Sequence, residues 1–340
     1  MARNKKILTL INFWCLSCPL RLRVRVHFRL FLSSTIFAKM ERDRLLLELL
    51  LPYTHLMKVG NKELSKKITL AFNEWFKLPD NVCNKIIDSV DMLQNGSLLI
   101  DDIQDNTLVR RGVPAAHCVY GVPLTLNTSI HIITLVLQEL LLLGTSMAPK
   151  IFCEGFLEVI RGQGIELYWR DNFICPTEEQ YDEINRKKTG HMYLICIRLM
   201  HLFSTNKTDY TDLVLTIGLY YQLRDDYCNL IQPEALDDWP TNEDNKPKIF
   251  CEDLSEGKFS LPIIHAAGTS DGDGVLHILR QRTRDVSLKK FCVSELQRLG
   301  SLEYTRNRLI SLDKHIRDEI NRFGGNSNLT SVMDDMKSWV

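Results

Sequence analysis

The chain has 340 residues, of which 45% are hydrophobic, so it can bury one large core or two modest ones. Lys and Arg number 42, as do Asp and Glu, and the formal net charge is zero. No overall positive field therefore favours a nucleic-acid partner. We expect no membrane span, because no apolar stretch stands out as approaching the length of a membrane-spanning helix. Ten scattered cysteines argue against a disulfide framework and indicate a reducing compartment such as the cytoplasm.

Residues 1–39 differ in composition from the rest of the chain. They are apolar and basic, and the first acidic residue is Glu41. This composition is typical of an organelle-targeting segment, and the basic start before the apolar residues 7–16 also fits a secretory signal. A third interpretation is that translation begins at Met40. We expect a leader over 1–39 that lies outside the fold, and one domain over 40–340. We expect the protein to be cytoplasmic, or mitochondrial if the leader is real and directs it there.

From residue 41 onward, apolar residues recur at helical spacing and strand-like alternation is almost absent. The pattern predicts an all-α domain without internal repeats. Thr177 to Gln180 form a capping box, which predicts a helix start at that point. Residues 231–248 have no helical pattern, and we expect a solvated loop there, including Asp237 and Asp238. The predicted helices cover 45–51, 68–76, 82–105, 130–143, 151–170, 178–203, 210–230, 262–267, 275–283 and 290–322.

Two short acidic segments lie inside predicted helices, at residues 101–105 (DDIQD) and 225–229 (DDYCN). Residues four apart share a helix face, so each segment directs two oxygen-bearing side chains toward one point. Mg²⁺ prefers such ligands and often bridges carboxylates to substrate phosphates. A single segment of this kind is more often a solvated helix face. Two of them with apolar flanks predict a metal–diphosphate site between two facing helices.

Basic residues that suit an anionic leaving group accompany these acids. Arg110 and Arg111 follow the first acidic segment within two helical turns, and arginine binds phosphate oxygens in bidentate fashion. Lys188, Lys248 and Lys258 are further candidates, although any one of them alone is more often a solvated charge.

Polar groups suited to a cation lie nearby in the sequence. Gly190 weakens the helix that carries Lys188 and Thr189 and could free backbone carbonyls to face a cavity. Gln222 lies one turn before Asp225. Carbonyl and amide dipoles stabilise positive charge without attacking it. Together with metal ions that withdraw a diphosphate, they indicate carbocation chemistry.

The chain resembles the trans-isoprenyl diphosphate synthases, and most closely the animal geranylgeranyl diphosphate synthases, over about residues 40–325. The similar segments occur in order at 97–106, 108–112, 162–164, 168–171, 222–227 and 250–258. The resemblance implies that 40–340 is an isoprenoid synthase domain, an all-α helical bundle around a deep central cavity. It also implies an allylic prenyl diphosphate substrate, three Mg²⁺ ions, and a homodimer or larger homo-oligomer.

The resemblance implies roles for residues at matching positions. The implied metal ligands are Asp101, Asp105 and Asp225. The implied ligands of the allylic diphosphate are Arg110, Lys188, Lys248 and Lys258. The implied catalytic residues are Lys188, Thr189 and Gln222, of which Thr189 and Gln222 would face the cation.

The chain departs from these synthases where they bind isopentenyl diphosphate, their second substrate. Their Gly-Lys-x-x-Arg element reads NKELS at residues 61–65, so Ser65 replaces the arginine, and Gln94 replaces a histidine. Lys62 and Arg111 remain as ligands for that diphosphate. Losing a bidentate phosphate ligand costs on the order of 2 kcal/mol, unless one of the lysines at 66 and 67 compensates.

A second departure follows Gly190, where the synthases tend to have small residues lining the cavity. This chain has larger side chains there, which predict a shorter prenyl chain, unless they point into neighbouring helices. These residues are His191, Met192, Tyr193, Leu194 and Arg198.

The ionising half of the predicted site is complete and the acceptor half is damaged. We therefore expect a terpene synthase of prenyltransferase descent, which ionises geranyl or farnesyl diphosphate and releases an acyclic terpene such as ocimene. No side-chain base stands out, so the departing diphosphate is the expected proton acceptor. The alternatives are a geranylgeranyl diphosphate synthase and a non-catalytic partner of another prenyltransferase.

Overall fold

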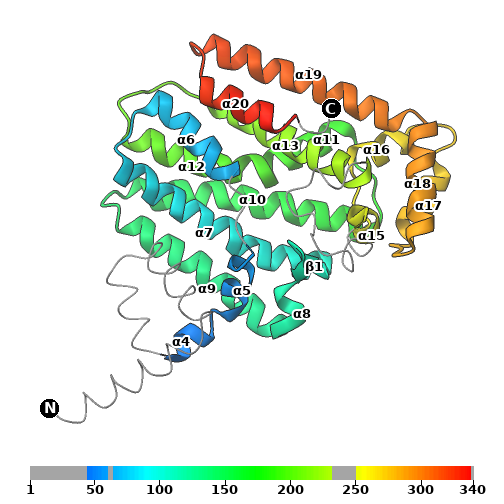
Figure 1. Ribbon diagram of the computed structural model, residues 1–340, viewed down its shortest axis with the longest axis horizontal. Helices are drawn as coiled ribbons and strands as arrows, with labels where there is room; N and C mark the ends of the chain where they lie inside the picture. The colour runs from blue at the N-terminus through cyan, green and yellow to red at the C-terminus, as the bar shows by residue number, and fades with distance from the viewer. Residues whose placement is uncertain (1–43, 60–63, 232–249, 338–340) are drawn as a thin grey trace.

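The computed structural model describes residues 44–59, 64–231 and 250–337. The leader, Lys62, Lys248 and the Asp237–Asp238 pair lie outside the described residues. Within the described part, nearly all regular structure is helical (Figure 1). The all-α class predicted from the sequence is confirmed.

Helices follow one another along most of the described chain. The helices of the first half are α4 (Arg44–Glu48), α5 (Leu51–Met57), α6 (Leu64–Phe76), α7 (Asp80–Asp105), α8 (Ala116–Tyr120), α9 (Val122–Leu141) and α10 (Met147–Asn172). Those of the second half are α11 (Glu178–Asn185), the π-helical turn η1 (Arg186–Gly190), α12 (His191–Phe203), α13 (Thr211–Ile231), α15 (Glu252–Glu256), α16 (Leu261–Ala267), α17 (Asp273–Arg280), α18 (Val286–Arg298), α19 (Ser301–Arg322) and α20 (Ser327–Asp335). Strands β1 (Val109–Arg110) and β2 (Val113–Pro114) pair antiparallel, Val109 opposite Pro114.

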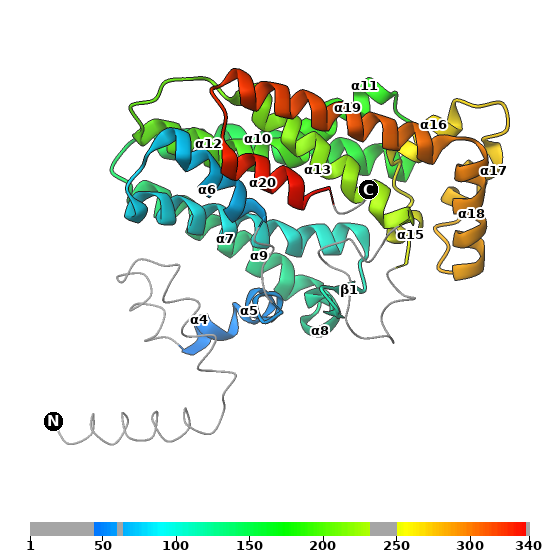
Figure 2. The ribbon, with the colours of Figure 1, turned by 45° about the horizontal axis from the view of Figure 1, so that its top comes forward.

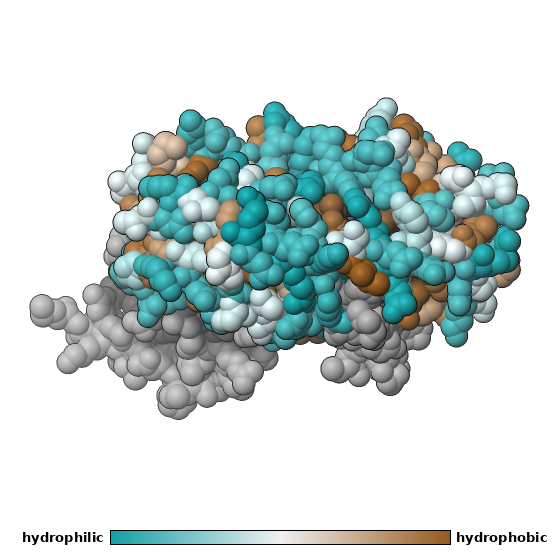
Figure 3. Space-filling view, turned by 90° about the horizontal axis from the view of Figure 1, so that it is seen from above, coloured by the Kyte–Doolittle hydropathy of each residue, from teal (hydrophilic) through white to brown (hydrophobic). Residues whose placement is uncertain are grey.

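The long helices form a bundle in which α7, α10, α12 and α13 occupy the centre (Figures 1 and 2). Helix α9 packs on α7, α19 packs on α13, and α20 packs on α6. Helices α17 and α18 lie at one end of the bundle, next to α15 and α16 (Figure 2). Figure 3 shows the face seen from above, where most residues are hydrophilic and hydrophobic ones are scattered, as is usual for a solvated surface.

Local signals in the sequence explain several helix ends. The capping box is present, with Gln180 N–H donating to the Thr177 hydroxyl and Thr177 N–H donating to the Gln180 side chain. Helix α7 ends at Asn106, whose left-handed backbone (φ 54°) stops the helix. The single helix predicted over 290–322 is wrong, because Gly300 adopts φ 73° and separates α18 from α19.

The π-helical turn η1 is packed between two helices that approach its backbone through glycines. A Cβ at Gly162 of α10 would lie 2.7 Å from the Lys188 nitrogen, and one at Gly218 of α13 would lie 2.4 Å from the Gly190 Cα. Only glycine allows such close approach. The predicted weak point in the helix over 178–203 is therefore a wide turn, fixed from both sides, which carries Lys188 and Thr189.

Helix α9 corrects one expectation. It is the one helix, in the part of the chain that the structure describes, that is long and apolar enough to cross a membrane by length and composition. Of its most apolar 18-residue stretch, 39% is buried in the protein, on a side that packs against α7. The core helix of a protein without a membrane span can meet the same criterion, so length and composition alone do not assign a membrane span to α9.

Candidate active site

A cavity of about 400 Å³ lies among α7, α10, η1, α12, α13 and α15. One part of its wall is apolar, and the other part carries carboxylates, lysines and amides. The apolar wall contains Leu98, Phe156, Val159, Ile160, Leu167, Met192, Tyr193 and Tyr221. This combination of an apolar wall with convergent polar groups is typical of a small-molecule site.

Most of the predicted site residues line this cavity. The ones that do are Asp101, Asp105, Arg110, Lys188, Thr189, Gln222, Asp225 and Lys258. Arg111 does not line it, and Lys62 and Lys248 lie outside the described residues. The two acidic segments, 120 or more residues apart in sequence, thus share one cavity through α7 and α13.

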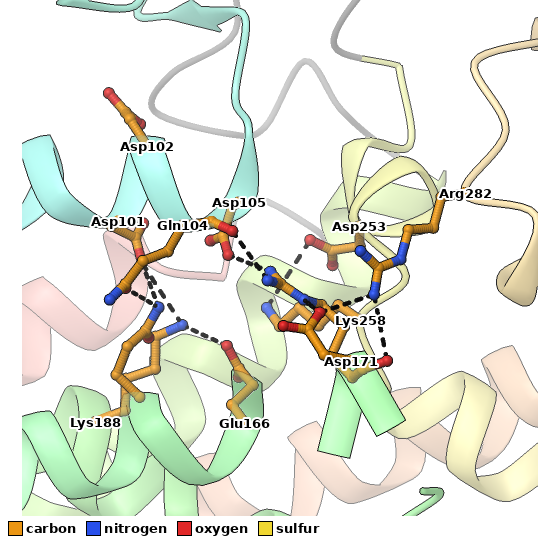
Figure 4. Close-up of polar contacts among 12 residues, drawn as sticks. Asp101, Asp102, Gln104, Asp105, Glu166, Asp171, Lys188, Asp253, Lys258 and Arg282 are labelled. Carbon is orange, nitrogen blue, oxygen red and sulfur yellow. Dashed lines mark hydrogen bonds and ion pairs between the residues drawn. The ribbon is translucent and has the colours of Figure 1, made fainter. Parts of the chain in front are cut away.

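Helix α7 presents Asp101 and Asp105 to the cavity, whereas Asp102 points the other way (Figure 4). Asp102 is buried and accepts a hydrogen bond from Arg110 Nε at 2.7 Å. Burial raises the pKa of Asp102, and the Arg110 guanidinium partly offsets that shift. Arg110 Nη2 also lies 3.6 Å from the Asp101 carboxylate, so Asp102 fixes a cation at the edge of the cavity.

Lys188 lies between acids of two helices. Its Nζ is 2.7 Å from Glu166 of α10 and 3.9 Å from Asp101 (Figure 4). Burial acts to lower the pKa of Lys188, but Glu166 and Asp101 raise it above its ordinary value. Burial acts to raise the pKa of Glu166, but Lys188 and Lys258 hold it below its ordinary value. The pair is therefore ionised, and Lys188 is a fixed positive charge in the cavity.

Asp105 is paired with Arg170, a residue near the end of α10. Arg170 Nη1 lies 2.5 Å from the Asp105 carboxylate, and Nη2 donates to the Gln104 carbonyl at 2.9 Å. Arg170 in turn contacts Asp171. Asp171 accepts a hydrogen bond from Arg282 at 2.9 Å (Figure 4). Burial and the neighbouring Asp101 raise the pKa of Asp105 to about 7. A chain of ion pairs therefore links α7 to the segment between α17 and α18.

Helix α15 adds carboxylates to the side of the cavity that carries Asp225. Glu252, Asp253 and Glu256 line it, and one oxygen of Asp253, Oδ2, is buried without a hydrogen-bond partner. Burial and neighbouring acids raise the pKa of Asp253 and Glu256 well above the ordinary range, and burial raises that of Glu252 to about 7. So many carboxylates in one cavity create a demand for positive charge.

This donor set fits divalent magnesium. Among the described residues, no three His, Cys, Asp or Glu side chains are close enough together to form a complete metal site. Carboxylates of α7 and of α13 with α15 nevertheless share the cavity, and Mg²⁺ typically takes one or two carboxylates together with phosphate oxygens. A metal-bound diphosphate between the two groups would also give the unpaired Asp253 oxygen a partner.

Thr189 and Gln222 meet at the cavity wall. The Thr189 hydroxyl donates to Gln222 Oε1 at 2.9 Å, and Gln222 Nε2 donates to Asp226 at 2.9 Å. Both cavity-lining side chains are therefore fixed by hydrogen bonds, so their dipoles are oriented before any substrate binds.

The large residues after Gly190 divide into two groups. Met192 and Tyr193 line the cavity, and Tyr193 packs edge to face on Tyr221, with ring centroids 6.3 Å apart. His191 instead lies 3.0 Å from the Arg186 carbonyl through Nδ1. Leu194 and Arg198, like His191, do not line the cavity. The expected bulky wall consists of Met192 and Tyr193.

The acceptor side differs from the ionising side. Gln94 lines the cavity, whereas Ser65 is 5% exposed on α6. Lys67 pairs with Asp335 of α20 at 2.8 Å, and neither Lys66 nor Lys67 lines the cavity. Arg111 Nη2 lies 3.4 Å from the Asn95 side chain, outside the cavity wall.

The sequence pattern of the family described as Polyprenyl synthetase matches residues 47–296. The chain belongs to the polyprenyl synthetase family. It is 46% identical over 293 residues to a protein named "Terpene synthase" from Matsumurasca onukii, an alignment that covers 86% of this chain and 94% of that protein. It is also similar to geranylgeranyl pyrophosphate synthases from Mucor circinelloides f. lusitanicus (40% identity, 84% and 92% coverage) and Dictyostelium discoideum (38%, 90% and 98%).

Family membership confirms the resemblance seen in the sequence. This polyprenyl synthetase is an enzyme of the isoprenoid diphosphate class, in a family that uses divalent metal ions. The roles of individual residues stay predictions.

Sequence reasoning missed several residues of this site. Glu166 and Arg170 lie four residues apart on α10, so helical spacing places them on one face, but it does not indicate that this face meets α7. Glu252, Asp253 and Glu256 are the acids of the segment before Lys258. Tyr181, which donates to Asp226, offers no such signal, because only the tertiary fold brings it to α13.

Proposed function

We propose that this polyprenyl synthetase is a magnesium-dependent terpene synthase. It ionises an allylic prenyl diphosphate, geranyl diphosphate in preference, and releases diphosphate and an acyclic terpene such as ocimene. The observation that carries the proposal is that the ionising residues share one cavity, whereas the acceptor side has Ser65 and Gln94 where the synthases have arginine and histidine.

The cavity residues support ionisation of a diphosphate ester. Bound Mg²⁺ would withdraw electrons from the leaving group, and Asp101, Asp105 and Asp225 would hold it. Lys188 and Lys258 both line the cavity, and each is paired with an acid at 2.7 Å, Glu166 and Asp226 respectively. They are positioned to bind the oxygens of the departing diphosphate. Preorganised charges of this kind commonly contribute the largest part of catalysis.

The apolar wall supports loss of a proton. A carbocation in an enclosed site either loses a proton or is captured by water, and apolar walls exclude water. The wall includes Phe156, Met192 and Tyr193, and Thr189 and Gln222 present oriented dipoles next to it. The released diphosphate, held by the lysines, is the proposed proton acceptor.

The experiment is to incubate the purified protein with Mg²⁺ and geranyl or farnesyl diphosphate, with and without isopentenyl diphosphate. We expect inorganic diphosphate and a volatile hydrocarbon from geranyl diphosphate alone, and little change on adding isopentenyl diphosphate. Volatiles are analysed in the headspace and prenyl diphosphates in the solution. Efficient formation of geranylgeranyl diphosphate without hydrocarbon would refute the proposal.

A reversal experiment tests the acceptor side directly. Gln94→His alone, and together with Ser65→Arg, should raise condensation with isopentenyl diphosphate relative to hydrocarbon release. Because Ser65 is buried, the melting temperature of each variant must be measured alongside. No gain of condensation in a folded double variant would show that the two residues do not explain the loss.

The second candidate is a geranylgeranyl diphosphate synthase, which the names of the relatives at 38–40% identity favour. It requires that the acceptor's diphosphate bind without the arginine and the histidine. The same incubation separates the candidates, because a synthase releases diphosphate at a useful rate only when isopentenyl diphosphate is present.

We also propose that the protein is a cytoplasmic homo-oligomer, at least a homodimer. Helices α9 and α10 carry exposed large apolar side chains, which suit an interface between copies. They include Val122, Leu126, Ile130, Leu141 and Leu157. Light scattering after size exclusion would give the mass, and a monomer would refute this proposal.

A further inference from the structure

Asp226 follows the predicted metal ligand Asp225 but has a different environment. Its side chain is fully buried and does not line the cavity. It accepts three hydrogen bonds: from the Tyr181 hydroxyl at 2.7 Å on Oδ2, and from Gln222 Nε2 at 2.9 Å and Lys258 Nζ at 2.7 Å on Oδ1. A carboxylate with three donors is fixed in orientation. Asp226 thereby connects α11, α13 and Lys258, which lies in the segment that follows α15.

The contact with Asp226 decides which way the Gln222 amide points. Lys258 Nζ can only donate hydrogen bonds, so Asp226 Oδ1 acts as an acceptor where Lys258 and Gln222 meet it. The NH₂ group of Gln222 must therefore face Asp226, and its oxygen must face Thr189, whose hydroxyl donates to it. The negative end of the amide dipole lies on the side of Thr189 and the cavity wall.

Tyr181 stands behind this arrangement on α11, 1% exposed and outside the cavity wall. Burial and the Asp226 charge raise the pKa of Tyr181, so its hydroxyl keeps its proton and can donate. Its donation occupies Oδ2, the Asp226 oxygen that neither Gln222 nor Lys258 contacts among the described residues. Without that donor, the buried oxygen would lack a partner, and the carboxylate would turn to find one.

We propose that Tyr181 is a positioning residue, which acts through Asp226 to hold the Gln222 amide in place for ionisation. The proposal rests on the proposed function, because it takes the cation to form beside Gln222 and Thr189. Tyr181 touches neither substrate nor cavity, so its loss should lower kcat and leave KM nearly unchanged. A small displacement of reacting groups can cost about 10²-fold in rate, and for a group acting through another we expect a loss of about tenfold.

The test is a double-mutant cycle on the full chain with Tyr181→Phe, Asp226→Asn and the double variant. The rate measured is release of inorganic diphosphate from geranyl diphosphate and Mg²⁺. If Tyr181 acts through Asp226, the double variant should be no slower than Asp226→Asn alone. Tyr304→Phe is the matched control. It removes the hydrogen bond that the Tyr304 hydroxyl of α19 donates to Glu178, which lies on α11 like Tyr181 but away from the cavity.

We expect kcat of Tyr304→Phe to stay within about twofold of the unchanged protein, since surface substitutions usually have small effects. The shift in melting temperature on adding Mg²⁺ and inorganic diphosphate should be the same for Tyr181→Phe and the control, because diphosphate binding does not depend on the amide. Losses that multiply in the double variant, or a Tyr181→Phe effect confined to KM, would overturn the proposal. So would a kcat equal to that of the control.

A second variant keeps the proposal testable if Tyr181→Phe does not fold. Gln222→Met removes the amide and keeps the contacts of Asp226 with Lys258 and Tyr181. It should then lower kcat by about tenfold with KM nearly unchanged, and an unchanged kcat would overturn the proposal. All rates are also measured with isopentenyl diphosphate. If diphosphate is released only with that second substrate, the proposed function fails, and the Tyr181 cycle is then decided on the condensation rate.

Discussion

The close contact between α13 and the π-helical turn can be tested by adding one methyl group, in Gly218→Ala. A Cβ at that position would lie 2.4 Å from the Gly190 Cα and 2.7 Å from the Gly190 nitrogen. Both neighbours are backbone atoms, so no side-chain rotation can relieve the contact. Helix α13 and the turn must move apart, and the turn carries Lys188 and Thr189.

The expected destabilisation follows from two opposing terms. Overpacking in a closely packed interior costs up to about 3 kcal/mol, and the better helix propensity of alanine offsets about 1 kcal/mol of it. The net loss of about 2 kcal/mol should lower the melting temperature by about 4 °C, at about 2 °C per kcal/mol for a chain of this size. Because the displaced turn holds two cavity residues, kcat should also fall by about ten- to a hundredfold.

Thermal unfolding followed by circular dichroism measures the first effect, and diphosphate release measures the second. The matched control is Gly274→Ala in α17, where no atom lies within 4 Å of the added Cβ. It should raise stability by up to about 1 kcal/mol and leave kcat unchanged. Equal melting temperatures and rates for the two variants would refute the reasoning, since they would show that the packing of α13 on the π-helical turn does not require glycine at position 218.

Three other predictions concern the metal site and the leader. Asp101→Ala and Asp225→Ala should each abolish turnover without altering the circular dichroism spectrum, because the two acids lie on different helices and cannot replace each other; more than a few per cent residual activity would contradict the metal assignment. Arg170→Gln should lower the Mg²⁺ concentration for half-maximal activity, because the guanidinium competes with the cation for Asp105; a raised requirement would indicate that Arg170 instead orients the carboxylate. Removing residues 1–39 should leave rate and solubility unchanged, and an insoluble product would show that the leader belongs to the fold.

Helical periodicity predicted the long elements of this fold because they bury one continuous face. Helix α7 was expected over 82–105 and spans Asp80–Asp105. Periodicity did not separate α18 from α19, since one glycine in a helical pattern has no fixed meaning. Gly96 continues α7, whereas Gly300 adopts a positive φ and ends a helix. Helix α20 was missed because it is short, and its stability comes from packing on α6.

The candidate site was predictable to the extent that its residues occur in local patterns. Asp101 and Asp225 stand out because each begins an acidic segment in apolar sequence. The partners that orient the charges were not predictable in this way. Arg170 reaches Asp105 across 65 residues, and Tyr181 reaches Asp226 across 45. Such contacts depend on how α10 and α11 pack against the helices that carry the acids, which no local pattern specifies.

The two halves of the site also differ in how strongly the fold constrains them. In the ionising half, three charges that line the cavity have a partner from another element: Lys188 has Glu166, Lys258 has Asp226, and Asp105 has Arg170. Removing one partner of such a pair would leave a buried charge unpaired, which typically costs 3–5 kcal/mol. Substitution of a member of these pairs therefore threatens folding as well as catalysis.

The acceptor half is less constrained. Gln94 lines the cavity from α7 without a charge to balance, and Ser65 is a small side chain buried on α6. A prenyltransferase that lost its arginine and histidine there would keep its fold and its ability to ionise an allylic diphosphate. Binding of the acceptor would weaken, and proton loss would become the fastest fate of the cation. Conversion of a condensing enzyme into a terpene synthase thus requires no change in the helices that surround the diphosphate.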